Sequence, residues 1–211
     1  MEEKNLQLDR LVFFCDAVVA IAITLLIFNL KIDHVTDGHL TFKNLLVPWR
    51  SFIAFTLSFL NIASFWKTHH SFFAYIKKID EKMLWFNIGW LFFIVTLPFS
   101  TSVVSSYFSN SPAMFLYSLN TFIVTIFQNM IWDYASDHKE FLKEGTLDAL
   151  TNRRFRVYCN LDMVNAVIAV IVSFFNPTLA FILLFTKLPM IIITRIFLAK
   201  RSRKKKKRLQ V

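Results

Sequence analysis

The chain has 211 residues, of which 55% are hydrophobic and 17% aromatic, a composition too apolar for a water-soluble domain to bury. Because a membrane-spanning helix needs roughly 20 mainly apolar residues, this length allows six crossings and excludes a sizeable additional soluble domain. The 24 Lys and Arg exceed the 14 Asp and Glu by ten, which by itself would favour a nucleic-acid partner, but the placement of these residues favours a membrane protein.

The apolar runs predict an all-α, polytopic membrane protein. Ten mainly polar residues precede the first run, without a basic region followed by a cleavage site, so that run predicts a span and not a removed signal. Residues 1–199 are expected to form one domain, and residues 200–211 a basic cytoplasmic tail. The six predicted spans are about 11–32, 45–66, 83–104, 113–132, 157–175 and 178–198.

Prolines and polar segments punctuate these spans. Pro48 and Pro112 suit first-turn positions, and Pro98 predicts a kink in the third span. Asn176 and Pro177 predict a tight turn between the fifth and sixth spans. The spacing of apolar residues within 133–156 suits a short amphipathic helix at the membrane interface.

Basic residues are concentrated in alternate connections. The connections on the side of the N-terminus, with the tail, hold 19 Lys and Arg, whereas the opposite side holds 3. The positive-inside rule therefore predicts that both termini are cytoplasmic. The tail is expected to orient the chain and to contact anionic lipid, at about 1 kcal/mol per basic residue, and no nucleic-acid partner is expected.

Ionisable residues within the spans need partners, because a charge in hydrocarbon is costly. Asp16 and Arg10 are six positions apart, about 240° around a helix, so each needs partners on other helices. The candidates on the same side of the membrane are His69 and His70, with Trp66 one turn above them, and Asn87 of the third span. The alternative is that Asp16 packs structurally and has no direct role in transport.

Three other charged residues lie within the fifth and sixth predicted spans. Asp162 and Arg195 are expected at a similar depth in the fifth and sixth spans and predict a salt bridge. Lys187 lies nearer to the middle of the membrane, where it is expected to snorkel or to point towards a wet crevice.

The sequence lacks the motifs of a catalytic or metal site. It has no Gly-rich phosphate loop and no Cys or His spacing for zinc, and the adjacent His69 and His70 diverge by about 100° on a helix. Cys15 and Cys159 are expected to be reduced thiols. No enzyme activity, metal site or cofactor is therefore expected. A TVGYG-type filter is also missing, so side chains would have to form the constriction of any channel.

One segment of the first span resembles the signature of the transmembrane protein 175 family, a family of lysosomal and prokaryotic potassium channels. The segment RLVFFCDAVVAIAITLL, residues 10–26, agrees at Arg10, Phe14, Asp16, Ala20, Ile21, Thr24, Leu25 and Leu26. The second span ends in FWKTHHSFF, which is similar to the family pattern at Trp66, His69 and His70. The third span is similar at Asp80, Leu84, Trp85, Asn87, Leu91, Pro98 and Phe99.

The resemblance implies a homotetramer in the plasma membrane of a prokaryote, with the first helix of each copy lining a central pore for passive potassium conduction. Carried over by position, the pore residues would be Ile21, Thr24, Leu25 and Phe28. Their spacing forms one helical stripe, which without the resemblance would equally suit a core or lipid-facing surface. Ile21 would form an apolar ring that gates by dewetting, and Thr24 would offer oxygens to potassium. Phe28 is bulkier than is usual in the family and would narrow the pore.

The resemblance also implies a structural or gating network that does not contact the ion. Its members would be Arg10, Phe14, Asp16, Trp66, His69, His70 and Asn87. Cys15 stands where the family has Ser, and a thiol donates a weaker hydrogen bond. The alternatives are an ion-coupled secondary transporter that uses Asp16, Asp162, Lys187 and His70, and a non-conducting membrane scaffold.

Overall fold

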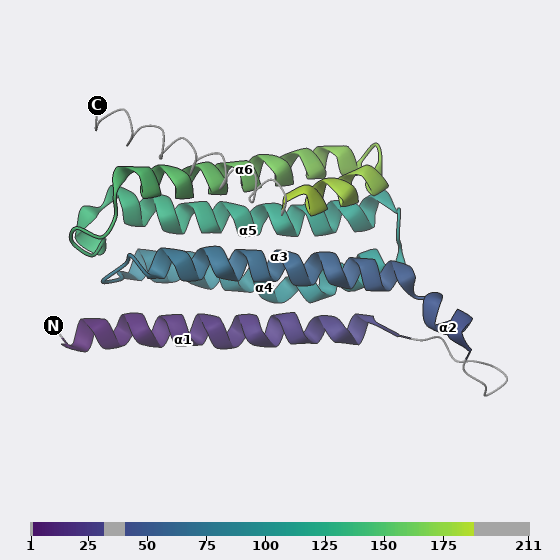
Figure 1. Ribbon diagram of the computed structural model, residues 1–211, viewed down its shortest axis with the longest axis horizontal. Helices are drawn as coiled ribbons and strands as arrows, with labels where there is room; N and C mark the ends of the chain where they lie inside the picture. The colour runs from purple at the N-terminus through teal and green to yellow at the C-terminus, as the bar shows by residue number, and fades with distance from the viewer. Residues whose placement is uncertain (1, 32–40, 188–211) are drawn as a thin grey trace, which may run out of the picture.

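The structure is a computed structural model that describes residues 2–31 and 41–187, and these residues are almost entirely helical. The helices are α1 (Glu2–Leu25), the 3-10 turn η1 (Leu26–Asn29), α2 (Phe42–Leu46), α3 (Trp49–Phe73), α4 (Glu81–Ser106), α5 (Ser111–Asp137), the 3-10 turn η2 (Lys139–Phe141), α6 (Ala149–Ser173) and a shorter helix, Pro177–Lys187. Figure 1 shows the long helices side by side, with α1 at one edge, α3 and α4 in the middle, and α5 and α6 at the other edge.

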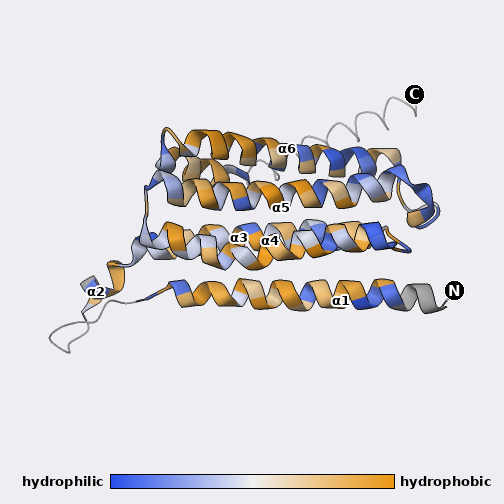
Figure 2. Ribbon diagram, turned by 180° about the vertical axis from the view of Figure 1, so that it is seen from behind, coloured by the Kyte–Doolittle hydropathy of each residue, from blue (hydrophilic) through white to orange (hydrophobic). Residues whose placement is uncertain are grey.

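Four helices within the described residues are long and apolar enough to cross a membrane. They are Gln7–Asn29, Glu81–Ser106, Ser111–Asp137 and Ala149–Ser173. Figure 2 shows hydrophobic residues along the helices and hydrophilic residues gathered at the connections between α3 and α4 and between α5 and α6. The prediction of an all-helical, multi-pass membrane protein is therefore confirmed.

The other two predicted spans are less fully described. The second corresponds to α3, which is long enough but carries many polar side chains and is not among the four. The sixth begins with the Pro177–Lys187 helix, and its remainder lies outside the described residues, as does the basic tail. The count of six spans therefore stays a prediction.

Helix boundaries follow caps and not the ends of apolar runs. Asp80 begins α4 by accepting a hydrogen bond from the Met83 N–H at 2.8 Å, and Asp148 begins α6 by accepting one from the Thr151 N–H at 2.9 Å. Because these two caps lie in polar sequence, α4 and α6 begin before the predicted spans. The predicted interfacial helix within 133–156 is wrong, since α5 continues to Asp137 and α6 begins at Ala149, with only η2 between them.

The two connections at the end of the bundle that carries the N-terminus are joined to each other. An antiparallel bridge pairs Ile76, after α3, with Leu142, after α5. The Lys77 N–H donates to the Phe141 carbonyl at 2.8 Å, and the Lys143 N–H donates to the Tyr75 carbonyl at 2.9 Å. The bridge fixes the end of the α3–α4 pair against the end of the α5–α6 pair.

Hydrogen bonds between side chains tie the helices together inside the bundle. Thr101 of α4 donates to Ser58 of α3 at 2.7 Å, and Ser58 donates to the Tyr117 hydroxyl of α5 at 3.0 Å. Asn61 of α3 donates to the same hydroxyl at 3.1 Å. Such bonds between helices contribute to association within a membrane, where burying apolar surface provides little driving force.

Candidate pore helix and polar network

Helix α1 is buried on one side and exposed on the other. Its buried side packs against α3 and α4 through Leu11, Cys15, Val19, Ala22 and Leu26. The predicted pore residues lie on the exposed side: Ile21 is 60% exposed, Phe28 is 69% exposed, and Thr24 and Leu25 lie between them. The structure thus brings all four predicted pore residues to one uncovered face.

From Arg10 to Lys31, the exposed face forms a stripe with alternating steps of four and three residues. We call this set the α1 stripe, and it comprises Arg10, Phe14, Ala17, Ile21, Thr24, Phe28 and Lys31. A repeat of 3.5 residues is the pattern by which helices pack along one another. Phe28 lies in η1, so it is displaced around the axis from the position that a continuous α-helix would give it.

Thr24 is the only uncharged polar residue of the α1 stripe. Its hydroxyl donates to the Ile21 carbonyl at 2.8 Å. The hydroxyl hydrogen is therefore used within the helix, and the lone pairs of the hydroxyl oxygen stay available to coordinate a cation.

The predicted network divides into two groups. In the first, the Trp66 indole N–H of α3 donates to an Asp16 carboxylate oxygen of α1 at 2.8 Å, and the Trp66 and His70 rings lie 5.5 Å apart. In the second, His69 Nε2 lies 2.8 Å from the amide oxygen of Asn87 of α4, and the His69 ring stacks on Trp90 at 4.3 Å. The two histidines face different partners, in agreement with their expected divergence.

Arg10 and Phe14 do not join either group. Within the described residues, Arg10 makes no hydrogen bond or ion pair with Asp16, because their spacing places them on different sides of α1. Both residues instead line a groove between α1 and the start of α4, which also contains Asp80 and Glu81. The separation of Arg10 from Asp16 agrees with the expectation that each needs partners on other helices, and the membership of Arg10 and Phe14 in one network stays a prediction.

Asp162 pairs with Lys187, whereas Arg195, its predicted partner, belongs to the part of the chain that the structure does not describe. Lys187 Nζ lies 3.1 Å from Asp162 Oδ2. Lys187 is only 2% exposed, so the expectation that it snorkels or faces a wet crevice is wrong. The turn at Asn176 could have predicted this pair. In a helical hairpin, residues equally far from the turn lie side by side, and the midpoint between Asp162 and Lys187 falls at residues 174 and 175.

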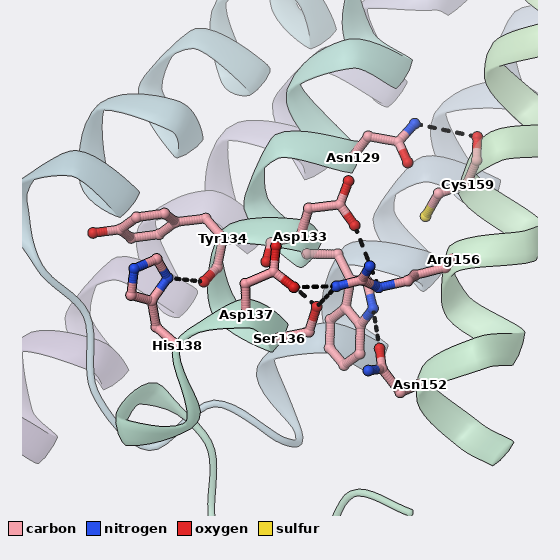
Figure 3. Close-up of polar contacts among 10 residues, drawn as sticks. Asn129, Asp133, Tyr134, Ser136, Asp137, His138, Asn152, Arg156 and Cys159 are labelled. Carbon is pink, nitrogen blue, oxygen red and sulfur yellow. Dashed lines mark hydrogen bonds and ion pairs between the residues drawn. The ribbon is translucent and has the colours of Figure 1, made fainter. Parts of the chain in front are cut away.

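Sequence reasoning missed a second polar junction, between α5 and α6. Figure 3 shows Arg156 of α6 held by Asp133, Ser136 and Asp137 of α5. The guanidinium donates to Ser136 Oγ at 2.9 Å, and Arg156 Nε lies 3.6 Å from Asp133 Oδ1. The sequence did contain a signal for this junction, because Asp133, Ser136 and Asp137 are spaced to lie on one face of a helix.

No metal site is apparent in the part of the chain that the structure describes. None of its His, Cys, Asp and Glu side chains gather in groups of three that could hold an ion. Cys15 and Cys159 are both free thiols, buried in α1 and α6 respectively.

Comparison with known proteins places this arrangement in a family. Residues 10–98 match the family described as endosomal/lysosomal potassium channel TMEM175. Potassium channel Cha6605_3372 of Chamaesiphon minutus is 30% identical over 154 residues, which cover 68% of this chain and 75% of that protein. The chain belongs to the TMEM175 family. Membership confirms the resemblance found in the sequence and, with it, the prediction of a potassium channel and not an enzyme.

Similarity to TMEM175 proteins also extends beyond the matched segment. Potassium channel HX13_20290 of Chryseobacterium sp. (strain P1-3) is 28% identical over 176 residues, which cover 81% of this chain and 85% of that protein. The crystal structure of a lysosomal potassium-selective channel TMEM175 homolog from Chamaesiphon minutus aligns with a TM-score of 0.72 at 24% identity. That alignment covers 93% of this chain and 98% of the other, so the fold is shared along nearly the whole chain.

Proposed function

We propose that four copies of this chain assemble around a central axis lined by α1 and conduct potassium passively through the plasma membrane of a prokaryote. The α1 stripe is the observation that supports this most strongly, since it is an exposed helix face with a 3.5-residue repeat. In this proposal the chain has six spans, with α3 as the second and the Pro177–Lys187 helix at the start of the sixth, and no cofactor takes part.

The stripe has the chemistry of a side-chain-lined constriction. Four copies of Ile21 form an apolar ring that holds water out until it dilates, which is gating by dewetting. One helical turn further, four Thr24 oxygens face the axis with their lone pairs free, because each hydroxyl hydrogen is bound to the Ile21 carbonyl. A partly dehydrated potassium ion binds there. Leu25 and Phe28 narrow the pore beyond this layer.

The orientation follows from the basic residues. The end of the bundle that carries the bridge between Ile76 and Leu142 also carries the exposed or half-buried Lys77, Lys78 and Lys143. This end faces the cytoplasm, with both termini, in accordance with the positive-inside rule. The tail then lies where it contacts anionic lipid.

Flux and current through purified protein in liposomes test the proposal. Ile21→Ala should raise the potassium leak because it opens the apolar ring. Ile171→Ala is the matched control, since Ile171 of α6 is 55% exposed, close to the 60% of Ile21, and should leave the leak unchanged. Equal effects of the two substitutions would place α1 against lipid.

Thr24 has a matched control of its own. Thr24→Val removes the hydroxyl and should lower the ratio of potassium to sodium permeability. Thr56 of α3 makes the same kind of bond, donating to the Phe52 carbonyl at 2.8 Å, and Thr56→Val should not change the ratio. Flux without single-channel current steps would instead indicate a transporter, and a folded tetramer that passes no cation would indicate a scaffold.

A further inference from the structure

A buried ion pair lies on the side of α3 away from the α1 stripe. Lys187 and Asp162 meet at 3.1 Å, and the Lys187 ammonium also lies 3.4 Å from the centroid of the Phe65 ring. All three side chains are buried, and they come from three different helices. The ammonium is thus held by a carboxylate on one side and an aromatic face on the other.

The pair is poorly explained by stability alone. Taking two charges out of water is costly, and apolar residues of similar volume commonly hold helices together as well as a buried pair does. Within the described residues, the second carboxylate oxygen of Asp162, Oδ1, has no hydrogen-bond partner. The carboxylate therefore depends on Lys187, and removing the ammonium would leave an uncompensated charge between α6 and the Pro177–Lys187 helix.

The contact with Phe65 links this pair to α1. Phe65 is followed directly by Trp66, which donates to Asp16 of α1 at 2.8 Å. One turn later on the same helix, His69 binds Asn87 of α4. A single turn of α3 therefore contacts the Lys187 ammonium through Phe65 and α1 through Trp66. Because Phe65 and Trp66 are adjacent in one helix, a displacement of Phe65 would also displace the partner of Asp16.

We propose that Lys187 and Asp162 are positioning residues for the pore helix, acting through Phe65 and Trp66 on Asp16. This inference rests on the proposed function of α1 as the pore helix. Neither residue contacts the permeating ion, so they determine how often the pore is open and not which cation it selects. Breaking the pair lets this turn of α3 relax and changes the packing of α1.

A double-mutant cycle on single-channel currents tests the coupling. Lys187→Met and Trp66→Phe should each change the open probability by about fivefold or more. The double variant should resemble either single variant, because both act on one chain of contacts. The ratio of potassium to sodium permeability should not change in any of these variants. Lys187→Arg keeps the positive charge and should retain the wild-type open probability.

The neighbouring residue provides the control. Thr186 is exposed on the same helix and donates only to its own Leu183 carbonyl at 2.6 Å, so Thr186→Val should leave the open probability unchanged. If Lys187→Met folds poorly, Asp162→Asn combined with Lys187→Gln removes both charges and keeps a hydrogen-bonding pair. Multiplicative effects in the cycle, or a normal open probability in both charge-removing variants, would overturn the inference.

A second measurement does not depend on conduction. Hydrogen–deuterium exchange of α1 peptides around Asp16 should be faster in Lys187→Met than in Thr186→Val, because α1 is held less firmly. Unchanged exchange in α1 would refute the link. Faster exchange in a protein whose wild type passes no potassium would support the link and refute the proposed channel, so the two failures are distinguishable.

Discussion

Gly89 of α4 lies directly against a side chain of α5, and this contact leads to a specific prediction. A Cβ atom at this position would lie 2.4 Å from Cε1 and 2.6 Å from Cζ of Phe127 on α5. Turning the Phe127 ring away would disrupt its stacking on Phe93, whose ring centroid lies 5.9 Å away. Gly89→Ala should therefore force α4 and α5 apart or displace the ring.

Two opposing effects set the magnitude. Alanine in place of glycine inside a helix gains about 1 kcal/mol, whereas overpacking a core costs about 1–3 kcal/mol. The free energy of unfolding of Gly89→Ala should therefore fall by about 1 kcal/mol. In a Phe127→Ala background the clash is gone, and the same substitution should raise the free energy of unfolding by up to about 1 kcal/mol.

Denaturant titration of the purified protein, followed by circular dichroism, measures this reversal of sign. Gly145→Ala serves as the control, because Gly145 has φ of +70° in a connection with no atom within 4 Å of its Cβ position. Its cost of about 1 kcal/mol arises from the backbone and should not depend on Phe127. A stabilising effect of Gly89→Ala with Phe127 present would refute the reasoning.

Three further predictions concern polar groups. Burial raises the pKa of Asp80, but the hydrogen bonds from Tyr134 and a backbone N–H together hold this pKa below its usual 3.8. The protein should therefore lose stability as the pH falls below about 4. In Asp80→Asn, the thermal midpoint should depend less on pH over that range. Asn87→Leu strands the buried His69 Nε2 and should cost about 1–3 kcal/mol of unfolding free energy, as measured by denaturant titration. Tyr117→Phe removes the acceptor shared by two α3 side chains and should lower the thermal midpoint.

The helices could largely be predicted from the sequence, because apolar runs of about 20 residues leave few alternatives in a membrane. Their ends could not, since the caps at Asp80 and Asp148 lie in polar segments where many residues are capable of capping. Helical periodicity predicted that Ile21 and Thr24 share one side of α1, and the structure adds that this side is exposed. Their assignment to a pore came from the family resemblance and stays a prediction.

Contacts between distant residues were harder to predict. The partner of Asp16 was expected among several groups at one depth, and the structure selects Trp66. Depth alone suggested Arg195 for Asp162, but the sequence analysis did not use the register of the hairpin at Asn176, which places Lys187 opposite Asp162. The backbone bridge between Ile76 and Leu142 left no signal in the sequence, because any residue can form a backbone hydrogen bond.

The bond between Asp16 and Trp66 has a consequence for biosynthesis. The two residues are 50 positions apart, and α1 packs on α3 and α4. During synthesis, α1 therefore emerges from the ribosome before either of its neighbours. Until α3 follows, the nascent helix depends on water or lipid headgroups to solvate its carboxylate, so α1 completes its folding only after later segments of the chain are inserted.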